Sequence, residues 1–278
     1  MNVLEFSLLV GACSLAAGFL GALTGLGGGV VLVPVLTLFF HVDIRYAVGA
    51  SLVSVIATSS GSAAAYVKEG FSNIRIGMFL EIATTLGALL GAFLALRVPT
   101  AAIAIVFGAV LLYSAYVSLS PQPVVAENQQ PDPLATRLRL NGSYPSLAGP
   151  KAYFVRRLPV GFAAMFGAGT LSGMLGIGSG AVKVLAMEYA MQIPFKVSTT
   201  TSNFMIGVTA AASAGVYLTR GYIEPGLAMP VMLGVLFGSV LGTRVLARSK
   251  TSSLRVVFGI VIILLGIQML YKGIMGNI

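Results

Sequence analysis

The chain has 278 residues, of which 57% are hydrophobic and only 9% are charged. An ordinary soluble domain carries about 25% charged residues, so this composition excludes a soluble enzyme, a secreted domain and a disordered chain. The formal net charge of +9 is typical of a membrane protein whose cytoplasmic loops face anionic lipid, and we expect no nucleic-acid binding.

Apolar runs, most of them long enough for membrane helices, follow one another along the chain. They cover about 3–24, 29–42, 46–66, 76–96 and 102–119, and then about 158–176, 180–192, 198–218, 226–247 and 255–271. The intervening stretch is rich in proline, Asn, Gln and Ser, which predicts a linker without a packed helix. We therefore expect an all-α, polytopic helical membrane protein with a first transmembrane repeat at 1–119, a linker at 120–157 and a second transmembrane repeat at 158–278.

The two halves are related by a shift of 151 residues, which needs no gap over about 100 residues. The shift aligns identical residues of several types, not only glycines. The matched pairs include Gly18 with Gly169, Gly25 with Gly176, Gly29 with Gly180, Ser51 with Ser202, and Tyr66 with Tyr217. Internal duplication of this kind is common among secondary transporters.

The charges in the loops favour inverted repeats over parallel ones. If the first two runs of each repeat form a glycine-broken helix hairpin, followed by three transmembrane helices, twelve Lys and Arg lie on one side of the membrane and four on the other. If each broken pair is a single crossing, the division is nine against seven. Because positive residues accumulate on the cytoplasmic side, we expect inverted repeats, a cytoplasmic linker and both termini outside.

Two glycine-rich breaks interrupt the first hairpin of each repeat, Gly-Leu-Gly-Gly-Gly at 25–29 and Gly-Ile-Gly-Ser-Gly at 176–180. Irregular backbone at membrane depth persists where it is buried or lines a watery cavity. Helices that restart after such breaks present free N–H groups and a partial positive charge. The breaks thus predict an anion site near the midplane, and the alternative is that the glycines only permit close helix packing. The candidate binding residues here are Gly25, Gly27, Gly28, Gly29, Gly176, Gly178, Ser179 and Gly180.

Hydroxyl residues gather in the span after each break. Ser51 in the first repeat, and Thr201, Ser202 and Asn203 in the second, are candidates to donate hydrogen bonds to an anion. The alternative is that these hydroxyls bond to their own helix or serve close packing.

Three charged residues lie inside apolar runs, where a charge is costly and usually faces a cavity or a partner. Lys183, close to the second break, is a candidate to attract an anion, and its alternative is a structural pair with Glu188 or Glu81. Glu81 is the candidate proton carrier, and its alternative is a position near the membrane surface.

One histidine, one cysteine and the absence of paired carboxylates in one span argue against an enzyme and against a metal site. No nucleotide-binding loop is present. We therefore expect no cofactor, and energy that comes from the membrane potential or an ion gradient.

The pattern Gly-(x)3-Gly-Leu-Gly-Gly-Gly-(x)4-Pro at 21–34, with Ala50-Ser51 and a degenerate copy at 172–185 with Thr201-Ser202, resembles the TauE/SafE family over about residues 8–271. The second copy departs from the pattern, because Ser179 replaces a glycine, Leu185 replaces Pro34 and Lys183 replaces Leu32. The resemblance implies a permease of the bacterial inner membrane whose partner is a small sulfur-containing anion in the lipid bilayer.

Together these features predict a secondary transporter, with export favoured, of a small sulfur oxyanion such as sulfite, an organosulfonate or thiosulfate. The alternatives are a proton-coupled anion importer and an anion channel. A membrane enzyme and a non-transporting scaffold account less well for the duplicated breaks. The sequence leaves the identity of the anion and the oligomeric state open.

Overall fold

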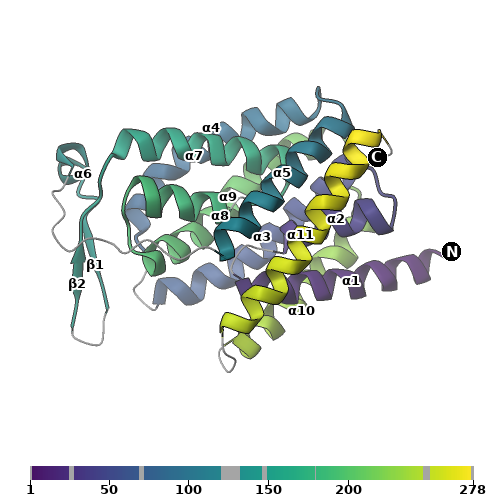
Figure 1. Ribbon diagram of the computed structural model, residues 1–278, viewed down its shortest axis with the longest axis horizontal. Coiled ribbons are helices and arrows are strands. Elements are labelled where there is room, and N and C mark those ends of the chain that lie inside the picture. The colour runs from purple at the N-terminus through teal and green to yellow at the C-terminus, as the bar shows by residue number, and fades with distance from the viewer. Residues whose placement is uncertain are drawn as a thin grey trace.

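The computed structural model describes residues 2–24, 28–68, 72–119, 132–145, 149–178, 180–246 and 251–276 (Figure 1). Each predicted apolar run forms a helix. The first half contains α1 (Val3–Thr24), α2 (Gly29–Phe39), α3 (Ile44–Lys68), α4 (Ile74–Ala95) and α5 (Thr100–Leu119). The second half contains α7 (Leu158–Leu175), α8 (Gly180–Leu185), a π-helical turn η1 (Ala186–Ala190), α9 (Phe195–Thr219), α10 (Pro225–Leu246) and α11 (Thr251–Met275).

Helices long and apolar enough to cross a membrane occur as two pairs related by the sequence shift. Within the described residues these segments are Leu4–Gly21 of α1, Ile74–Ala95 of α4, Leu158–Leu175 of α7 and Pro225–Gly242 of α10. Large apolar side chains such as Ile82, Phe93 and Phe237 point away from the protein interior, as expected for a surface that faces lipid. The prediction of an all-α membrane protein is confirmed.

The linker has local structure of its own. A five-residue helix, α6 (Pro133–Arg137), begins where the Asp132 carboxylate accepts a hydrogen bond from the Leu134 N–H, with proline in the first turn. Two strands, β1 (Gly142–Tyr144) and β2 (Lys151–Tyr153), then pair antiparallel. The expectation of a linker without any packed helix is therefore wrong for the five residues of α6. The high proline content argues against a helix, but Asp132 and Pro133 together form a favourable helix start.

Close helix pairs repeat the duplication in three dimensions. Helix α1 packs along α10, and the equivalent helices α7 and α4 pack along each other. A side chain on Gly18 would meet the Val235 backbone, and a side chain on Gly169 would meet the Thr84 backbone. These are the same contact after the shift of 151 residues, so the α1–α10 and α7–α4 interfaces are equivalent.

The equivalent helices α5 and α11 pack against each other and run in opposite directions (Figure 1). Gly108 in α5 lies against Gly266 and Leu270, whereas Gly273 near the end of α11 lies against Ala101 and Ile105 near the start of α5. The other pair of equivalent long helices, α3 and α9, forms the centre of the molecule, where the side chains of Leu52, Val55, Ile206 and Ala210 are buried.

Candidate functional site

The first glycine break leads into α2 at Gly29. Gly28 and Gly29 are buried, and the start of α2 has no side-chain cap. The first N–H groups of a helix lack partners within the helix, and in the described residues no N-cap side chain accepts from them at the start of α2. Gly25 and Gly27 lie outside the described residues.

The second break has a backbone that requires glycine. Gly176 and Gly178 both have a φ of +67°, a left-handed conformation that costs other residues roughly 1–2 kcal/mol. The Gly176 N–H closes α7 by donating to the Ser172 carbonyl, at 2.8 Å, and α8 begins at Gly180. Ser179 lies outside the described residues.

The two breaks meet through Ser51 in the centre of the protein. The Ser51 hydroxyl donates to the Gly176 carbonyl, with 2.7 Å between the oxygens. A methyl group on Gly29 would lie 2.5 Å from Ser51 Oγ and 2.9 Å from the Gly176 carbonyl oxygen. The start of α2 and the end of α7 therefore approach to a distance that only glycine allows.

The predicted hydroxyl residues of α9 divide between two places. Ser202, the equivalent of Ser51, donates to the Gly180 carbonyl at 3.3 Å, so its hydroxyl also contacts the second break. The Thr201 hydroxyl instead accepts a hydrogen bond from the Asn73 N–H at the start of α4, at 3.1 Å. Asn203 is joined to α3 by its backbone, because its carbonyl accepts from the Ser59 hydroxyl at 2.7 Å.

A buried chain of polar groups connects Lys183 to Glu81. The Lys183 ammonium on α8 donates to the Thr209 hydroxyl on α9, and that hydroxyl donates to Glu81 Oε1 on α4, at 2.6 Å. Lys183 is fully buried, and Glu81 is 8% exposed. The other carboxylate oxygen, Glu81 Oε2, is buried and has no hydrogen-bond partner among the described residues. We call Lys183, Thr209 and Glu81 the polar triad.

The duplication makes the polar triad asymmetric. The shift of 151 residues relates Thr209 to Thr58, but it relates Lys183 to Leu32 and Glu81 to Met232. The basic and the acidic residue therefore occur together in one of two equivalent places and are both replaced by apolar residues in the other. This favours the interpretation that the two charges compensate each other.

Sequence reasoning missed Thr209, the residue that joins the two charges. Its signal was the match between Thr58 and Thr209 under the shift. The predicted alternative partner, Glu188, is buried in η1, and no hydrogen bond joins it to Lys183 in the described part of the chain. Glu81, the candidate proton carrier, is buried between helices, and its hydrogen-bond partner Thr209 comes from a helix distant in the sequence.

Comparisons with known proteins agree on a membrane transporter. A family model described as sulfite exporter TauE/SafE matches residues 10–269. The probable membrane transporter protein YunE of Bacillus subtilis is 30% identical over 278 residues, which cover 98% of this chain and 99% of that protein. YdhB of the same organism, also described as a probable membrane transporter protein, is 27% identical over 82% of this chain and 83% of its own. A probable membrane transporter protein of Xylella fastidiosa is 23% identical over 98% of this chain and 97% of its own. No solved structure matches the chain.

Proposed function

Since the chain belongs to the TauE/SafE family of membrane transporters, we propose that it is a secondary transporter that exports a small sulfur-containing oxyanion. Sulfite, an organosulfonate and thiosulfate are the candidate substrates. The anion binds between the two glycine breaks, near the centre of the membrane. The observation that carries this proposal is the approach of Gly29 to Gly176, since it brings both breaks to one place.

The chemistry of the breaks suits an oxyanion. The uncapped start of α2 provides backbone donors and a partial positive charge. The Ser51 and Ser202 hydroxyls contact the second break and donate to its carbonyl groups. Binding requires these hydroxyls to rotate from the carbonyls towards the anion, so the bonds that join α3 and α9 to the second break would open when substrate enters.

Membrane potential is a sufficient source of energy for export. An anion that leaves a cell with a negative interior gains about 2.3 kcal/mol per charge for each 100 mV. The polar triad supports a second candidate, proton-coupled import, because Glu81 Oε2 is buried without a partner in the described residues and is available for a proton.

We propose that the two repeats have inverted orientations in the membrane. The support is the packing of α5 against α11: these helices are equivalent under the duplication and antiparallel. A two-fold axis that relates antiparallel neighbours is perpendicular to them, and for membrane-crossing helices it lies in the plane of the bilayer. The loop charges then support a cytoplasmic linker and outside termini.

Transport by purified protein in liposomes tests the substrate and the direction. Liposomes loaded with sulfite, taurine-type sulfonate, thiosulfate, phosphate or chloride are given a potassium-valinomycin potential, and anion efflux is measured. We expect potential-driven efflux of a sulfur oxyanion in preference to chloride. Counterflow of labelled substrate would identify a carrier, and its absence during rapid flux would identify a channel. Flux that requires a pH gradient and disappears in Glu81→Gln would favour the proton-coupled importer.

The variant Gly29→Ala tests the position of the site. Its methyl group would collide with Ser51 Oγ and the Gly176 carbonyl, so we expect at least a 10-fold loss of flux in protein that still folds. Gly167→Ala in α7 is the matched control, because nothing lies within 4 Å of the added methyl group. Normal flux in Gly29→Ala would remove the glycine breaks from the mechanism.

A further inference from the structure

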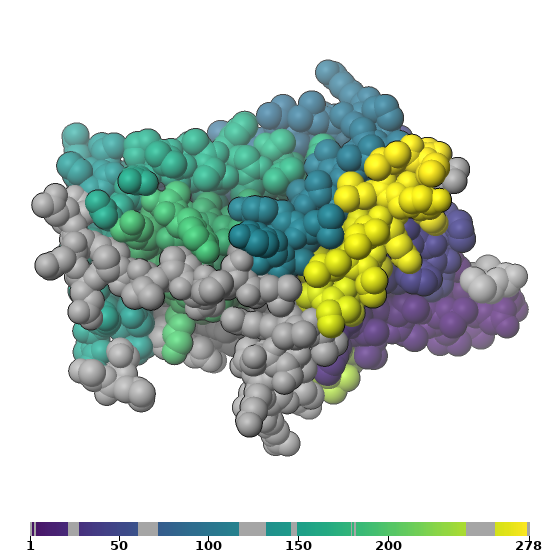
Figure 2. Space-filling view, in the orientation of Figure 1, coloured from purple at the N-terminus to yellow at the C-terminus, as the bar shows by residue number. Residues whose placement is uncertain are grey.

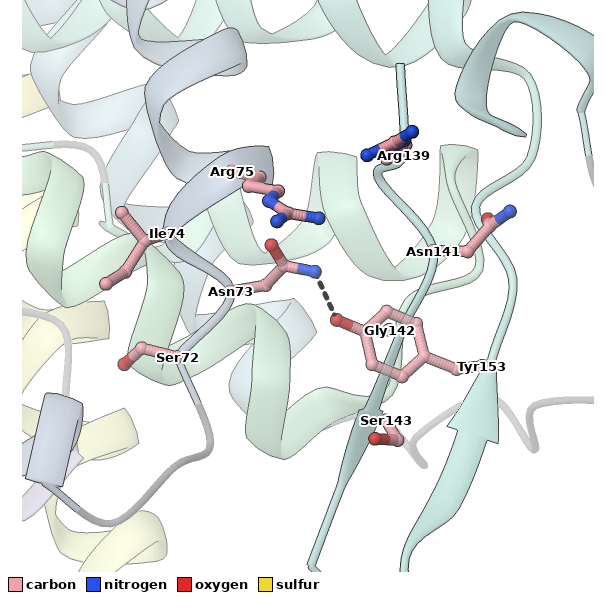
Figure 3. Close-up of a pocket in the computed structure, with 9 residues that line it drawn as sticks. All are labelled: Ser72, Asn73, Ile74, Arg75, Arg139, Asn141, Gly142, Ser143 and Tyr153. Atoms are coloured by element: carbon pink, nitrogen blue, oxygen red, sulfur yellow. Dashed lines mark hydrogen bonds between the residues drawn. The ribbon is translucent and has the colours of Figure 1, made fainter. Parts of the chain in front are cut away.

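A pocket of about 310 Å³ lies between the start of α4 and the linker (Figure 3). Ser72, Asn73 and Arg75 line it on one side, and Arg139, Gly142 and Tyr153 belong to its other side. The hairpin β1–β2 stands at one end of the helix bundle (Figure 1), so the pocket is separate from the glycine breaks. Figure 3 shows the Arg75 guanidinium extending from α4 towards the linker.

Hydrogen bonds hold the two walls together at Asn73. The Asn73 side-chain amide donates to the Tyr153 hydroxyl at 2.6 Å and to the Leu140 carbonyl at 3.2 Å. Its amide oxygen accepts from the Ile76 N–H and so caps α4. The pocket therefore has a fixed shape in which strand β2 and helix α4 are joined directly.

The described residues that line the pocket carry positive charge from Arg75 and Arg139. Arg75 and Arg139 are both exposed, and neither guanidinium has a hydrogen-bond or ion-pair partner within the described residues. No Asp or Glu is among the described residues that line the pocket. Burial raises the pKa of the Tyr153 phenol, so this residue contributes no negative charge near neutral pH.

We propose that this pocket binds a small tetrahedral oxyanion of the sulfate or phosphate type. Guanidinium groups form paired, charge-assisted hydrogen bonds with such anions, and two of them from opposite walls can hold one anion between α4 and the linker. The anion is either a free inorganic ion or the phosphate of a lipid headgroup. This site does not depend on the transported substrate.

Binding there would reach the transport helices through Asn73. The Asn73 N–H donates to the Thr201 hydroxyl, and Thr201 directly precedes Ser202, whose hydroxyl contacts the second glycine break. An anion that binds both α4 and the linker would therefore restrain Asn73, which is hydrogen-bonded to Thr201 on α9.

A single introduced tryptophan tests the site, because the natural chain contains no tryptophan. Ser143→Trp places the reporter on an exposed position of β1 that lines the pocket. Sulfate and phosphate are titrated against the full-length protein in detergent, with emission recorded for the reporter and bound labelled sulfate counted by equilibrium dialysis for the unmodified chain. We expect saturable binding that weakens about 10-fold or more in Arg75→Gln or Arg139→Gln.

Arg137→Gln is the matched control, because Arg137 is also exposed in the linker but does not line the pocket. It should bind sulfate as the parent does. Nanodiscs of phosphatidylcholine and of phosphatidylglycerol separate the two sources: a headgroup ligand would change the emission in phosphatidylglycerol before sulfate is added. If Arg75→Gln and Arg139→Gln retain the sulfate binding of Arg137→Gln, and neither lipid changes the emission in an arginine-dependent way, the proposal is overturned.

Discussion

Lys183 and Glu81 are the residues that a membrane protein of this kind should be least able to tolerate. A charge at the centre of a bilayer costs about 2.5–3.5 kcal/mol on insertion scales. The structure offsets this cost by placing Thr209 between the two charges, where its hydroxyl accepts from the ammonium and donates to the carboxylate. Their replacement by Leu32 and Met232 in the equivalent place indicates that neither charge is retained without the other.

The variant Lys183→Met should therefore lose stability, by about 3–5 kcal/mol, because the Glu81 carboxylate would remain buried without its cation. Thermal unfolding of the purified protein in detergent measures this loss. Adding Glu81→Gln to Lys183→Met should restore most of the melting temperature, since the uncompensated charge is then removed.

Glu188→Gln in the same Lys183→Met background is the matched control and should restore nothing. If Glu188→Gln rescues folding and Glu81→Gln does not, the polar triad is not the structural pair. The rescued double variant also isolates the role of Lys183 in binding: if its ammonium attracts the substrate, anion affinity should fall about 10- to 100-fold even in this stable protein.

At the scale of helices, glycine determines which elements pack together. Without a hydrophobic driving force between helices in lipid, small residues allow the close backbone approach that stabilises association. Gly87 of α4 lies against the Phe166 and Thr170 backbone of α7, and Gly238 of α10 lies against the equivalent Leu15 and Phe19 of α1. The same kind of helix–helix interface therefore occurs twice, between α4 and α7 and between α10 and α1.

Gly87→Ala and Gly238→Ala should destabilise the protein by a similar amount, about 1–3 kcal/mol each, through overpacking. The added methyl group would lie 2.1 Å from the Phe166 carbonyl oxygen in the first case and 2.0 Å from the Leu15 carbonyl oxygen in the second. Melting temperatures measured against Gly215→Ala, where nothing lies within 4 Å, check the expectation. Unchanged melting temperatures in both Gly87→Ala and Gly238→Ala would contradict it.

For the whole molecule, the positions of the chain ends are relevant to topology. Both termini lie at one end of the bundle, and the hairpin β1–β2 lies at the opposite end (Figure 1). The space-filling view shows that α5 and α11 form adjoining parts of one outer face (Figure 2). This arrangement fits the proposed inverted repeats, which separate the termini from the linker by the thickness of the membrane.

Cysteine labelling tests this orientation in intact cells. In a Cys13→Ser background, Ser143→Cys should resist an impermeant thiol reagent, because the linker is proposed to be cytoplasmic, whereas Asn2→Cys should react. Both residues are exposed, so access to the solvent on each side decides the result. Permeabilised cells provide the control, in which Ser143→Cys should react. Labelling of Ser143→Cys from outside would refute the orientation.

The sequence alone determined the apolar helices, the duplication and the location of both glycine breaks. These features are encoded locally. Apolar runs of membrane-spanning length predict helices, and a repeated spacing of glycines can be recognised in the sequence without knowledge of the fold. The same local information placed Lys183 next to a break and identified Ser51 and Ser202 as equivalent hydroxyl residues.

Only the tertiary structure decided which partners these residues have. Ser51 contacts Gly176 across 125 residues of chain, and Thr209 contacts Glu81 across 128. The choice between Glu81 and Glu188 for Lys183, and the attachment of Thr201 to Asn73 rather than to a glycine break, depended on how α4 packs against α9. Periodicity within one helix contains no information on such pairings, because they arise when distant segments bury their polar groups together in a medium where no water can satisfy them.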